Sequence, residues 1–379
     1  MSRNSKIAVR DSAAATRLLE TTLAHLRELV AFDTQNPPRE IGTAGIFEYV
    51  RTQLPGLQWA ITNHGGGSVS LFAQRGNPRL LFNVHLDTVP AAPTWTRDPF
   101  KLDVSDSRAT ALGACDIKGA AAALLTAVAH TNGDVALLFT SDEEANDARC
   151  VASFLAQKRP FDAVVVAEPT RCEAVLAHRG ISSALIRFAG RAGHASGSSA
   201  LGDSAVHQAL RWGAKALGRV ESLQHERFGG LTGLRFNVGR IEGGIKANVI
   251  APSAEVRFGF RPLPSMDTDG LLADFLQCAE TVPAEFTETF RGPPLPAGNI
   301  ADAEARRLAA RDFADAHHVP VGNAVDFWTE ASLFSRAGYT AIVLGSGDIA
   351  QAHGADEYVE LSQLQQIAEI YVAMIDGLH

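Results

Sequence analysis

The N-terminal part of the chain carries two runs in which apolar side chains recur at helical spacing. In residues 13–32 the leucines and Val30 fall three and four positions apart, which predicts an amphipathic helix. Asn36-Pro37-Pro38 ends this helix, because proline lacks the backbone N–H that a helix needs. A second helix is predicted over residues 46–54, and it ends at Pro55-Gly56.

Four short runs rich in Val, Leu and Ile are typical of strands buried on both faces, since they are apolar without alternation. They lie at residues 79–84, 134–139, 163–166 and 340–344. Helices are predicted between the first three runs, at residues 119–130 and 151–157. Alternating strands and helices predict an α/β fold, a three-layer α/β/α domain with a mostly parallel central sheet.

The pattern changes from about residue 181, where apolar and polar residues alternate as in antiparallel strands with one wet face. The strands are predicted at residues 182–188, 234–241 and 254–260, with helices at 204–217 and 271–279. Residues 291–296 resemble a linker, and a helix at 303–316 follows. We therefore predict an inserted α+β domain, 181–290, between two parts of the α/β domain, 1–180 and 291–379.

Length and composition fit a globular protein of about two domains and exclude some other classes. The chain has 379 residues, 46% of them hydrophobic, and a formal net charge of −8 with scattered basic residues, which argues against a nucleic-acid partner. No run approaches the ~20 apolar residues of a membrane span, and the N-terminus has no apolar segment. Four cysteines without a CxxC pair indicate reduced thiols, so we expect a cytoplasmic protein with no membrane partner.

Side chains able to bind metal follow the predicted buried strands, near the edge where sites form in open parallel sheets. Taken singly, each has a plain structural interpretation: a satisfied His–Asp pair, a helix cap for Asp116, or a solvated acidic turn for Glu143-Glu144. Glu168 is the exception, because a charged residue rarely follows a buried valine run unless it is paired or bound. Together they supply N and O donors for two adjacent divalent ions, suited to zinc, cobalt or manganese. The residues are His85, Asp87, Asp116, Glu143, Glu144, Glu168 and His353.

One glycine pattern points elsewhere. Residues 340–350 predict a strand followed by GxGxxA, which would suit a dinucleotide site if a helix, another strand and an acidic residue came next. Gly354 interrupts the segment and the chain ends before a second strand fits, so we do not expect nucleotide binding.

At this point the chain resembles the aminoacylase-type metallopeptidase family, which includes acetylornithine deacetylase, succinyl-diaminopimelate desuccinylase, aminoacylase and carboxypeptidase G. The matching motifs run in family order over nearly the whole chain, which makes the resemblance specific. They are Asn83-Val-His-Leu-Asp-Thr-Val-Pro90, Gly113-Ala-Cys-Asp-Ile-Lys-Gly119, Thr140-Ser-Asp-Glu-Glu144, Ala167-Glu-Pro-Thr170, Arg191-Ala-Gly-His-Ala195, Lys246-Ala-Asn-Val-Ile250 and Gln351-Ala-His353.

The resemblance implies a centre of two divalent metal ions, zinc or cobalt. His85, Asp116 and Glu168 would bind one ion. Asp116 would bridge to a second, held also by Glu144 and His353. It further implies that Glu143 is the general base on the water between the ions and that Asp87 supports His85.

The inserted domain would act as lid and dimer contact. By the same resemblance, His194 reaches the active site of the partner subunit of a homodimer and stabilises the oxyanion. Asn248 and Arg261 match positions that hold the substrate carboxylate, and Arg179 is a weaker candidate that is as readily structural. Two departures, Leu112 for Arg and Gly259 for Asp, touch no proposed ligand but put the fine substrate geometry in doubt.

Within the family the chain most resembles the acetylornithine deacetylase branch, and in it the enzymes of arginine biosynthesis that deacetylate N-acetylcitrulline. The segments that carry this likeness are Asp326-Phe-Trp-Thr-Glu330, Phe228-Gly-Gly-Leu-Thr-Gly-Leu234 and Gly347-Asp-Ile-Ala-Gln-Ala-His353. The predicted activity is hydrolysis of an N-acetyl amino acid, a small molecule, to acetate and the free amino acid. The alternatives are acetylornithine as substrate, a desuccinylase or dipeptidase on the same scaffold, and a non-catalytic binding homologue.

Overall fold

The computed structural model describes residues 12–145 and 147–377, which form two compact units. Unit 1 takes in the chain up to Leu176, together with Leu308–Gly322 and the residues from Thr329 onward. Unit 2 takes in Ala177–Arg307 and Asn323–Trp328. Unit 2 is therefore formed by two insertions into unit 1, a long one followed by a short one.

A six-stranded sheet forms the centre of unit 1, in the order β1-β2-β6-β3-β7-β14. Its parallel strands are β6 (Val135–Thr140), β3 (Leu80–His85), β7 (Ala163–Val166) and β14 (Thr340–Val343). Two antiparallel strands, β1 (Gln58–Gly65) and β2 (Ser68–Arg75), extend it on one side. The predicted mostly parallel sheet is confirmed, and the four apolar runs form its parallel part.

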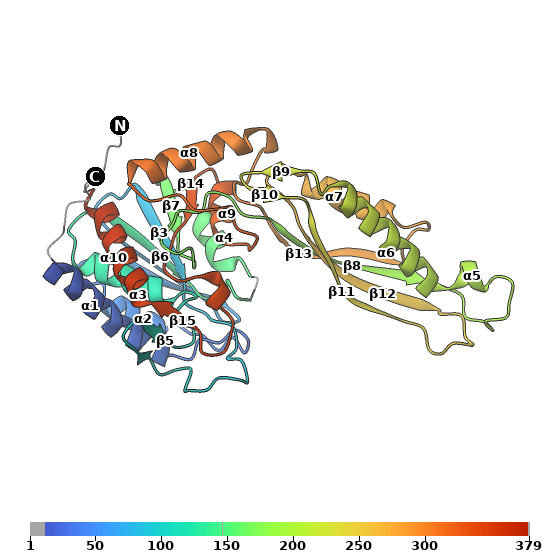
Figure 1. Cartoon of the computed structure of the whole chain (residues 1–379), viewed down its shortest axis with the longest axis horizontal. Coiled ribbons are helices and arrows are strands. Elements are labelled where there is room, and N and C mark those ends of the chain that lie inside the picture. Colours follow the sequence, from blue (N-terminus) through green and yellow to red (C-terminus); the bar gives the residue numbers. More distant parts are fainter. Residues whose placement is uncertain (1–11, 146, 378–379) are drawn as a thin grey trace. The chain divides into compact units, whose positions relative to one another are not determined.

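Helices cover both faces of this sheet (Figure 1). One layer consists of α1 (Ser12–Ala31), α3 (Lys118–Ala129) and α10 (Leu361–Asp376), which pack against one another. Phe82 of β3 meets Tyr371 of α10 on this face. The other layer contains α4 (Arg149–Leu155) and α9 (Ala331–Arg336), where the Phe154 ring packs at an angle against Phe72 of β2 and Phe334. The three-layer α/β/α architecture follows from strands that are apolar on both faces.

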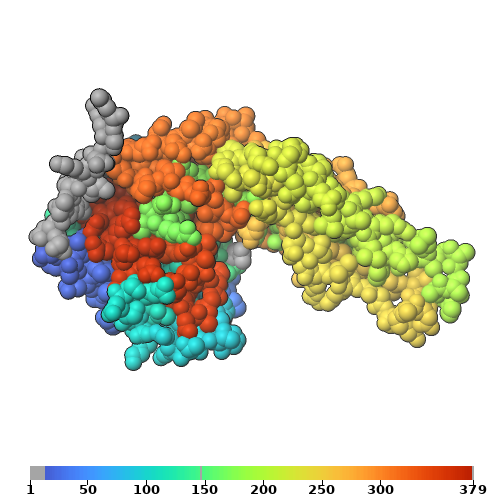
Figure 2. All heavy atoms as spheres, in the orientation of Figure 1, coloured from blue at the N-terminus to red at the C-terminus, as the bar shows by residue number. Residues whose placement is uncertain are grey.

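A small three-stranded sheet lies beside these layers, in the order β15-β5-β4. It joins β15 (Tyr358–Glu360) to β5 (Arg108–Thr110) and β4 (Asp103–Val104). Figure 2 shows the segment near residue 100 beside the C-terminal segment at the surface of unit 1, and Thr96 donates two hydrogen bonds to Asp356 there. Unit 1 also contains α2 (Ile46–Thr52) and a 3-10 turn, Ile349–Gln351.

Unit 2 is built on a four-stranded antiparallel sheet in the order β11-β12-β8-β13. Its strands are β8 (Ile181–Ala189), β11 (Arg235–Gly243), β12 (Ser253–Arg261) and β13 (Glu285–Gly292). Helices α6 (Ala205–Ser222) and α7 (Thr268–Gln277) cover one face, where Trp212 donates its indole N–H to the backbone oxygen of Phe275. Along β12, Val256 and Phe258 point under the helices, so Arg257 and Gly259 lie on the open face.

The remaining elements are α5 (Ala200–Asp203), β9 (Arg227–Phe228), β10 (Leu231–Thr232), a 3-10 turn at Ile300–Asp302 and the longer helix α8 (Ala303–Ala316). The predicted linker at 291–296 is wrong at its start, because Arg291 and Gly292 are the last residues of β13. In the part of the chain that is described, no helix combines the length and apolar character needed to cross a membrane.

Candidate metal centre

The carboxyl ends of three adjacent parallel strands bring the first candidate ligands together. His85 is the last residue of β3, Glu168 lies two residues after β7, and Glu143 and Glu144 follow β6 by three and four residues. Neighbouring parallel strands end at the same edge of the sheet, so these side chains meet there. Asp116 joins them from the turn before α3.

His353 reaches the same place from the loop between the 3-10 turn at Ile349–Gln351 and β15. Its Nε2 lies 3.2 Å from Oδ2 of Asp116 and 3.1 Å from Oε1 of Glu144. The strand before this loop approaches Glu168 closely. A Cβ on Gly345 would lie 2.5 Å from the backbone oxygen of Glu168, so close packing accounts for a glycine there. This contact accounts for the first glycine of the GxGxxA pattern.

Two overlapping groups of three donors result. In one, Nε2 of His85 lies 3.3 Å from Oδ1 of Asp116 and 3.9 Å from Oε1 of Glu168. The other consists of Asp116, Glu144 and His353, and in each group the donor atoms lie within 4.8 Å of one another. Asp116 belongs to both and offers a different oxygen to each. The five residues His85, Asp116, Glu144, Glu168 and His353, called here the ligand cluster, thus have the arrangement that two ions sharing one carboxylate would need.

The donor atoms of the first group are placed to bind a metal ion and do not form hydrogen bonds with one another. Nε2 of His85, Oδ1 of Asp116 and Oε1 of Glu168 are buried, and none has a hydrogen-bond partner among the described residues. Buried polar atoms are rarely left unsatisfied, because each costs free energy. Three such atoms converging on one point, with imidazole nitrogen and carboxylate oxygen donors, match the chemistry of a zinc-type ion.

Crowded charge shifts the pKa values of these residues. Burial raises the pKa of Glu168 well above its usual range, and the Asp116 carboxylate adds to the shift. Burial lowers the pKa of His85, but the nearby carboxylates of Asp116 and Asp87 raise it more. Hydrogen bonds to Asp116 and then Glu144 raise the pKa of His353 to about 11. Divalent cations would replace the protons that hold these like charges together, since metal binding displaces protons from its ligands.

Asp87 holds two members of the ligand cluster in place. Nδ1 of His85 lies 3.0 Å from the backbone oxygen of Asp87 and 3.5 Å from its carboxylate. The carboxylate Oδ2 accepts hydrogen bonds from the backbone N–H of Glu144 at 3.1 Å and from the Asn36 amide at 2.8 Å. Such contacts fix the ring orientation and direct Nε2 toward the ligand space.

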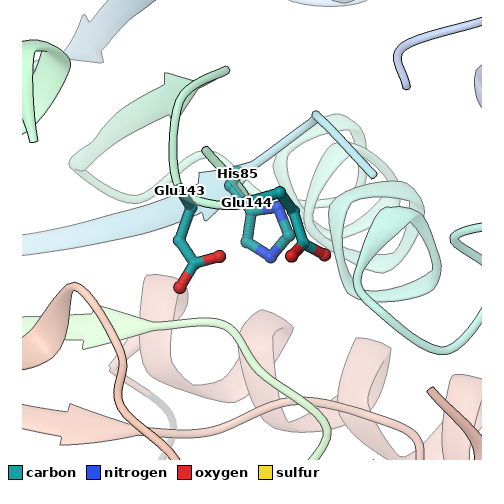
Figure 3. Close-up of side chains that lie close together, drawn as sticks. All are labelled: His85, Glu143 and Glu144. Carbon is teal, nitrogen blue, oxygen red and sulfur yellow. The ribbon is translucent and has the colours of Figure 1, made fainter. Parts of the chain in front are cut away.

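Glu143 lies beside the ligands with its carboxylate free of hydrogen bonds among residues 12–145 and 147–377. Figure 3 shows the carboxylates of Glu143 and Glu144 on either side of the His85 ring, and the donor atoms of these three residues also lie within 4.8 Å of one another. Burial raises the pKa of Glu143, and the Glu168 and Glu144 carboxylates raise it further. A carboxylate with a raised pKa beside a metal site suits a general base.

Two predicted site residues lie in loops at one end of the unit 2 sheet. His194 is exposed, forms an isolated bridge with Val249, and contacts the Ser196 hydroxyl through Nδ1 at 2.7 Å. Asn248 is exposed next to it, and its backbone oxygen accepts the N–H of Ala195 at 3.1 Å. Through the bridge to Val249, both residues are placed near the end of the sheet at which β12 begins.

The predicted arginines lie at the other end of β12 and differ from each other. Arg261, its last residue, lines a hollow on the open face of the sheet. Its guanidinium has neither a hydrogen bond nor an ion pair in the described part of the chain. Arg179 is fully buried, pairs with Asp326, and donates to the backbone oxygens of Gly233 at 2.6 Å and Thr232 at 2.8 Å. These contacts fit a structural role for Arg179.

Sequence reasoning did not identify three buried residues around the ligand cluster. Asn36 binds Asp87, although its position before two prolines indicated only a helix end. Glu330 accepts a hydrogen bond from the Thr140 hydroxyl at 3.1 Å, and burial followed by the charge of Asp142 raises its pKa to about 8. Glu357 binds the backbone at Asp116. Of these, only Glu330 lies in a quoted motif.

Comparisons with known proteins agree with this geometry. The model of "Peptidase family M20/M25/M40" matches residues 81–377. The chain is 65% identical over 365 residues to the N-acetyl-L-citrulline deacetylase of Xanthomonas campestris pv. campestris, covering 96% of this chain and 100% of that protein. It is 32% identical over 314 residues to the acetylornithine deacetylase of Pectobacterium carotovorum subsp. carotovorum, covering 79% of this chain and 80% of that one.

The fold has solved counterparts. An M20 family metallo-carboxypeptidase from Sulfolobus solfataricus superposes with a TM-score of 0.69 at 18% sequence identity, covering 94% of this chain and 98% of that one. The family match takes in all of unit 2 and most of unit 1, so the resemblance to the aminoacylase-type metallopeptidases is confirmed. The chain belongs to peptidase family M20/M25/M40.

Proposed function

We propose that the chain hydrolyses the amide of an N-acetylated amino acid, and that its substrate is N-acetyl-L-citrulline, giving acetate and citrulline for arginine biosynthesis. The observation that carries this proposal is the ligand cluster, in which two donor groups share Asp116 beside the free carboxylate of Glu143. The substrate follows the 65% identical relative, which is a deacetylase of that compound. The second candidate, acetylornithine, has the support of a relative at 32% identity.

In this proposal His85, Asp116 and Glu168 hold one ion, and Asp116, Glu144 and His353 hold the other. Two divalent ions, zinc or cobalt, would polarise the amide carbonyl and lower the pKa of a water between them. Asp87 keeps the His85 ring oriented, so that Nε2 faces the site. Glu143 takes the proton from the attacking water and passes it to the departing amine.

Unit 2 supplies substrate contacts in the same proposal. His194 donates a hydrogen bond to the oxyanion that forms at the amide carbon. Arg261 pairs with the substrate carboxylate, a task for which a guanidinium presents two parallel donors. Asn248 contributes a further hydrogen bond.

The spacing of these residues supports a homodimer. His194 and Asn248 lie near the start of β12, whereas Arg261 is at its end. A nine-residue strand spans about 26 Å, far more than an N-acetyl amino acid can bridge. If both ends contact one substrate, they come from two copies of the chain. We therefore propose that unit 2 acts as lid and dimer contact, and that His194 serves the partner's site.

A cytoplasmic enzyme is part of the proposal. The four cysteines, Cys115, Cys150, Cys172 and Cys278, are free of disulfides, as is usual in a reducing compartment.

The test is steady-state hydrolysis of N-acetylcitrulline and N-acetylornithine by metal-stripped enzyme with zinc or cobalt restored. We expect metal-dependent turnover with a higher kcat/KM for acetylcitrulline. A preference for acetylornithine would replace the substrate and leave the centre intact. If the protein binds the ions but hydrolyses neither compound, the next substrates to test are succinylated amino acids and dipeptides. A protein inactive on all of them would be a binding homologue.

A further inference from the structure

The loop that carries His353 also carries a buried carboxylate. Glu357, four residues after His353, is 2% exposed and directly precedes β15. Its backbone oxygen accepts the N–H of Ala111 at 3.1 Å, just beyond β5. The loop is therefore attached at its C-terminal end to the segment that leads toward Asp116.

The carboxylate of Glu357 binds the backbone at Asp116 itself. Its Oε1 accepts the N–H of Cys115 at 2.8 Å and the N–H of Asp116 at 3.0 Å. The two partners lie 242 and 241 residues away along the chain, so the contact joins two distant segments. One oxygen bound by two successive N–H groups restricts the rotation of the peptide that carries Asp116.

No arginine, lysine or histidine among the described residues forms an ion pair with Glu357. Burying a carboxyl group is costly unless hydrogen bonds compensate. The two hydrogen bonds from the backbone of Cys115 and Asp116 provide that compensation. Moving Asp116 away would break them and leave buried polar atoms without partners.

We infer that Glu357 is a positioning residue that joins Asp116 to His353, so that the two ligands are held as one piece. The inference rests on the proposed two-ion centre. It predicts an asymmetry between the two ions. The ion held by His85 and Glu168, which are set by β3 and β7, would depend on Glu357 only through Asp116. The ion held by Asp116, Glu144 and His353 would depend on Glu357 through Asp116 and also through the loop that carries His353.

The test is zinc binding to metal-stripped protein, by calorimetry with a competing chelator, for the unaltered chain and variants of Glu357. In Glu357→Ala we expect one of two zinc sites to weaken about 10–100-fold, as when other supporting contacts of metal ligands are removed. The other site shares only Asp116 with it and should weaken by at least about threefold less. Glu357→Gln keeps an acceptor oxygen at the same reach and should keep both sites within about threefold. Glu357→Asp is too short and should resemble Glu357→Ala.

Glu360→Gln is the matched control, because Glu360 lies on β15 and pairs with Arg108 away from the ligands. It should leave both zinc sites unchanged. Equal weakening of both sites, or a lower Tm with both zinc affinities unchanged, would overturn the inference and leave Glu357 a structural residue. If Glu357→Ala does not fold, the inference is tested with Glu357→Gln and Glu357→Asp, by comparing the affinities of the two zinc sites in these variants. An unaltered chain that binds one zinc ion would contradict the two-ion proposal and this inference with it.

Discussion

The two units hold their candidate functional side chains in opposite ways. In unit 1 three members of the ligand cluster, His85, Asp116 and Glu168, are buried, and only His353 is exposed. Asp87 fixes both His85 and the backbone of Glu144. In unit 2 His194 and Asn248 are exposed, and the His194 ring contacts a hydroxyl two residues away. Donors for an ion must be placed before it binds, because rearranging them would consume binding free energy. Donors for a substrate can remain in solvent until it arrives.

The largest expected effect is in the buried region. Glu143→Gln removes the proposed base and should lower kcat by about 10²–10⁴-fold while two ions remain bound. The measurement is acetate release together with metal content per chain. Glu20→Gln, an exposed residue of α1, is the control and should be neutral. Activity within about tenfold of the unaltered enzyme would remove Glu143 from the mechanism.

The next effect concerns the exposed region. His194→Ala should lower kcat by about 10²–10³-fold, the usual loss for one oxyanion donor, with the metal content unchanged. Mixing it with Glu143→Gln sharpens the comparison. If His194 serves the partner's site, dimers that combine one of each variant contain one complete site and regain activity. Mixed dimers as inactive as either parent would show that His194 does not cross to the partner.

Arg261 should affect binding more than chemistry. Arg261→Ala should raise KM about 10–100-fold, since a hydrogen bond to a charged group contributes about 1.5–3 kcal/mol, and should change kcat little. Arg257→Ala is the matched control on the same strand face, where Arg257 pairs with Glu255. A fall in kcat of about 10–100-fold with no change in KM would contradict the assignment of Arg261 to substrate binding.

The smallest effect concerns stability in the absence of metal. The pKa of Glu330, raised to about 8, exceeds its usual value of 4.5, so the folded chain binds more protons than the unfolded chain between these values. Glu330 should therefore make the stripped protein less stable as pH rises from 4.5 to 8. Glu330→Gln should remove this loss, with a gain on the order of 1–3 kcal/mol at pH 8 and little change at pH 4.5. Urea unfolding at both pH values measures it, and a variant less stable at pH 8 would be the contrary result.

The same contrast explains what could be predicted from the sequence. The four parallel strands of unit 1 were predicted because they are apolar on both faces. The antiparallel strands β1 and β2 were not predicted, and β1 is mostly exposed. The helix α10 has buried residues at helical spacing, including Leu364, Ile367 and Tyr371, and could have been predicted. Strand β13 has only partly buried and exposed positions before its last residue, and it pairs with a strand about a hundred residues away.

The candidate ligands were predictable because each follows a strand or belongs to a motif. Their supports were not. Asn36 and Glu357 act through hydrogen bonds to residues 51 and 241 positions away, and no local pattern encodes such a contact. Arg179 shows the reverse limit, since an arginine that closes a buried network cannot be distinguished by sequence from one that binds substrate.

The most direct test of the central claim is a zinc titration of metal-stripped enzyme, following acetate release from N-acetylcitrulline and bound zinc in parallel. We predict no turnover in the stripped protein, two zinc ions per chain at saturation, and activity that returns as they bind. His85→Ala and Glu168→Ala should abolish this return. Full turnover in the stripped protein, or full recovery in both variants, would contradict a metal-dependent deacetylase built on the ligand cluster.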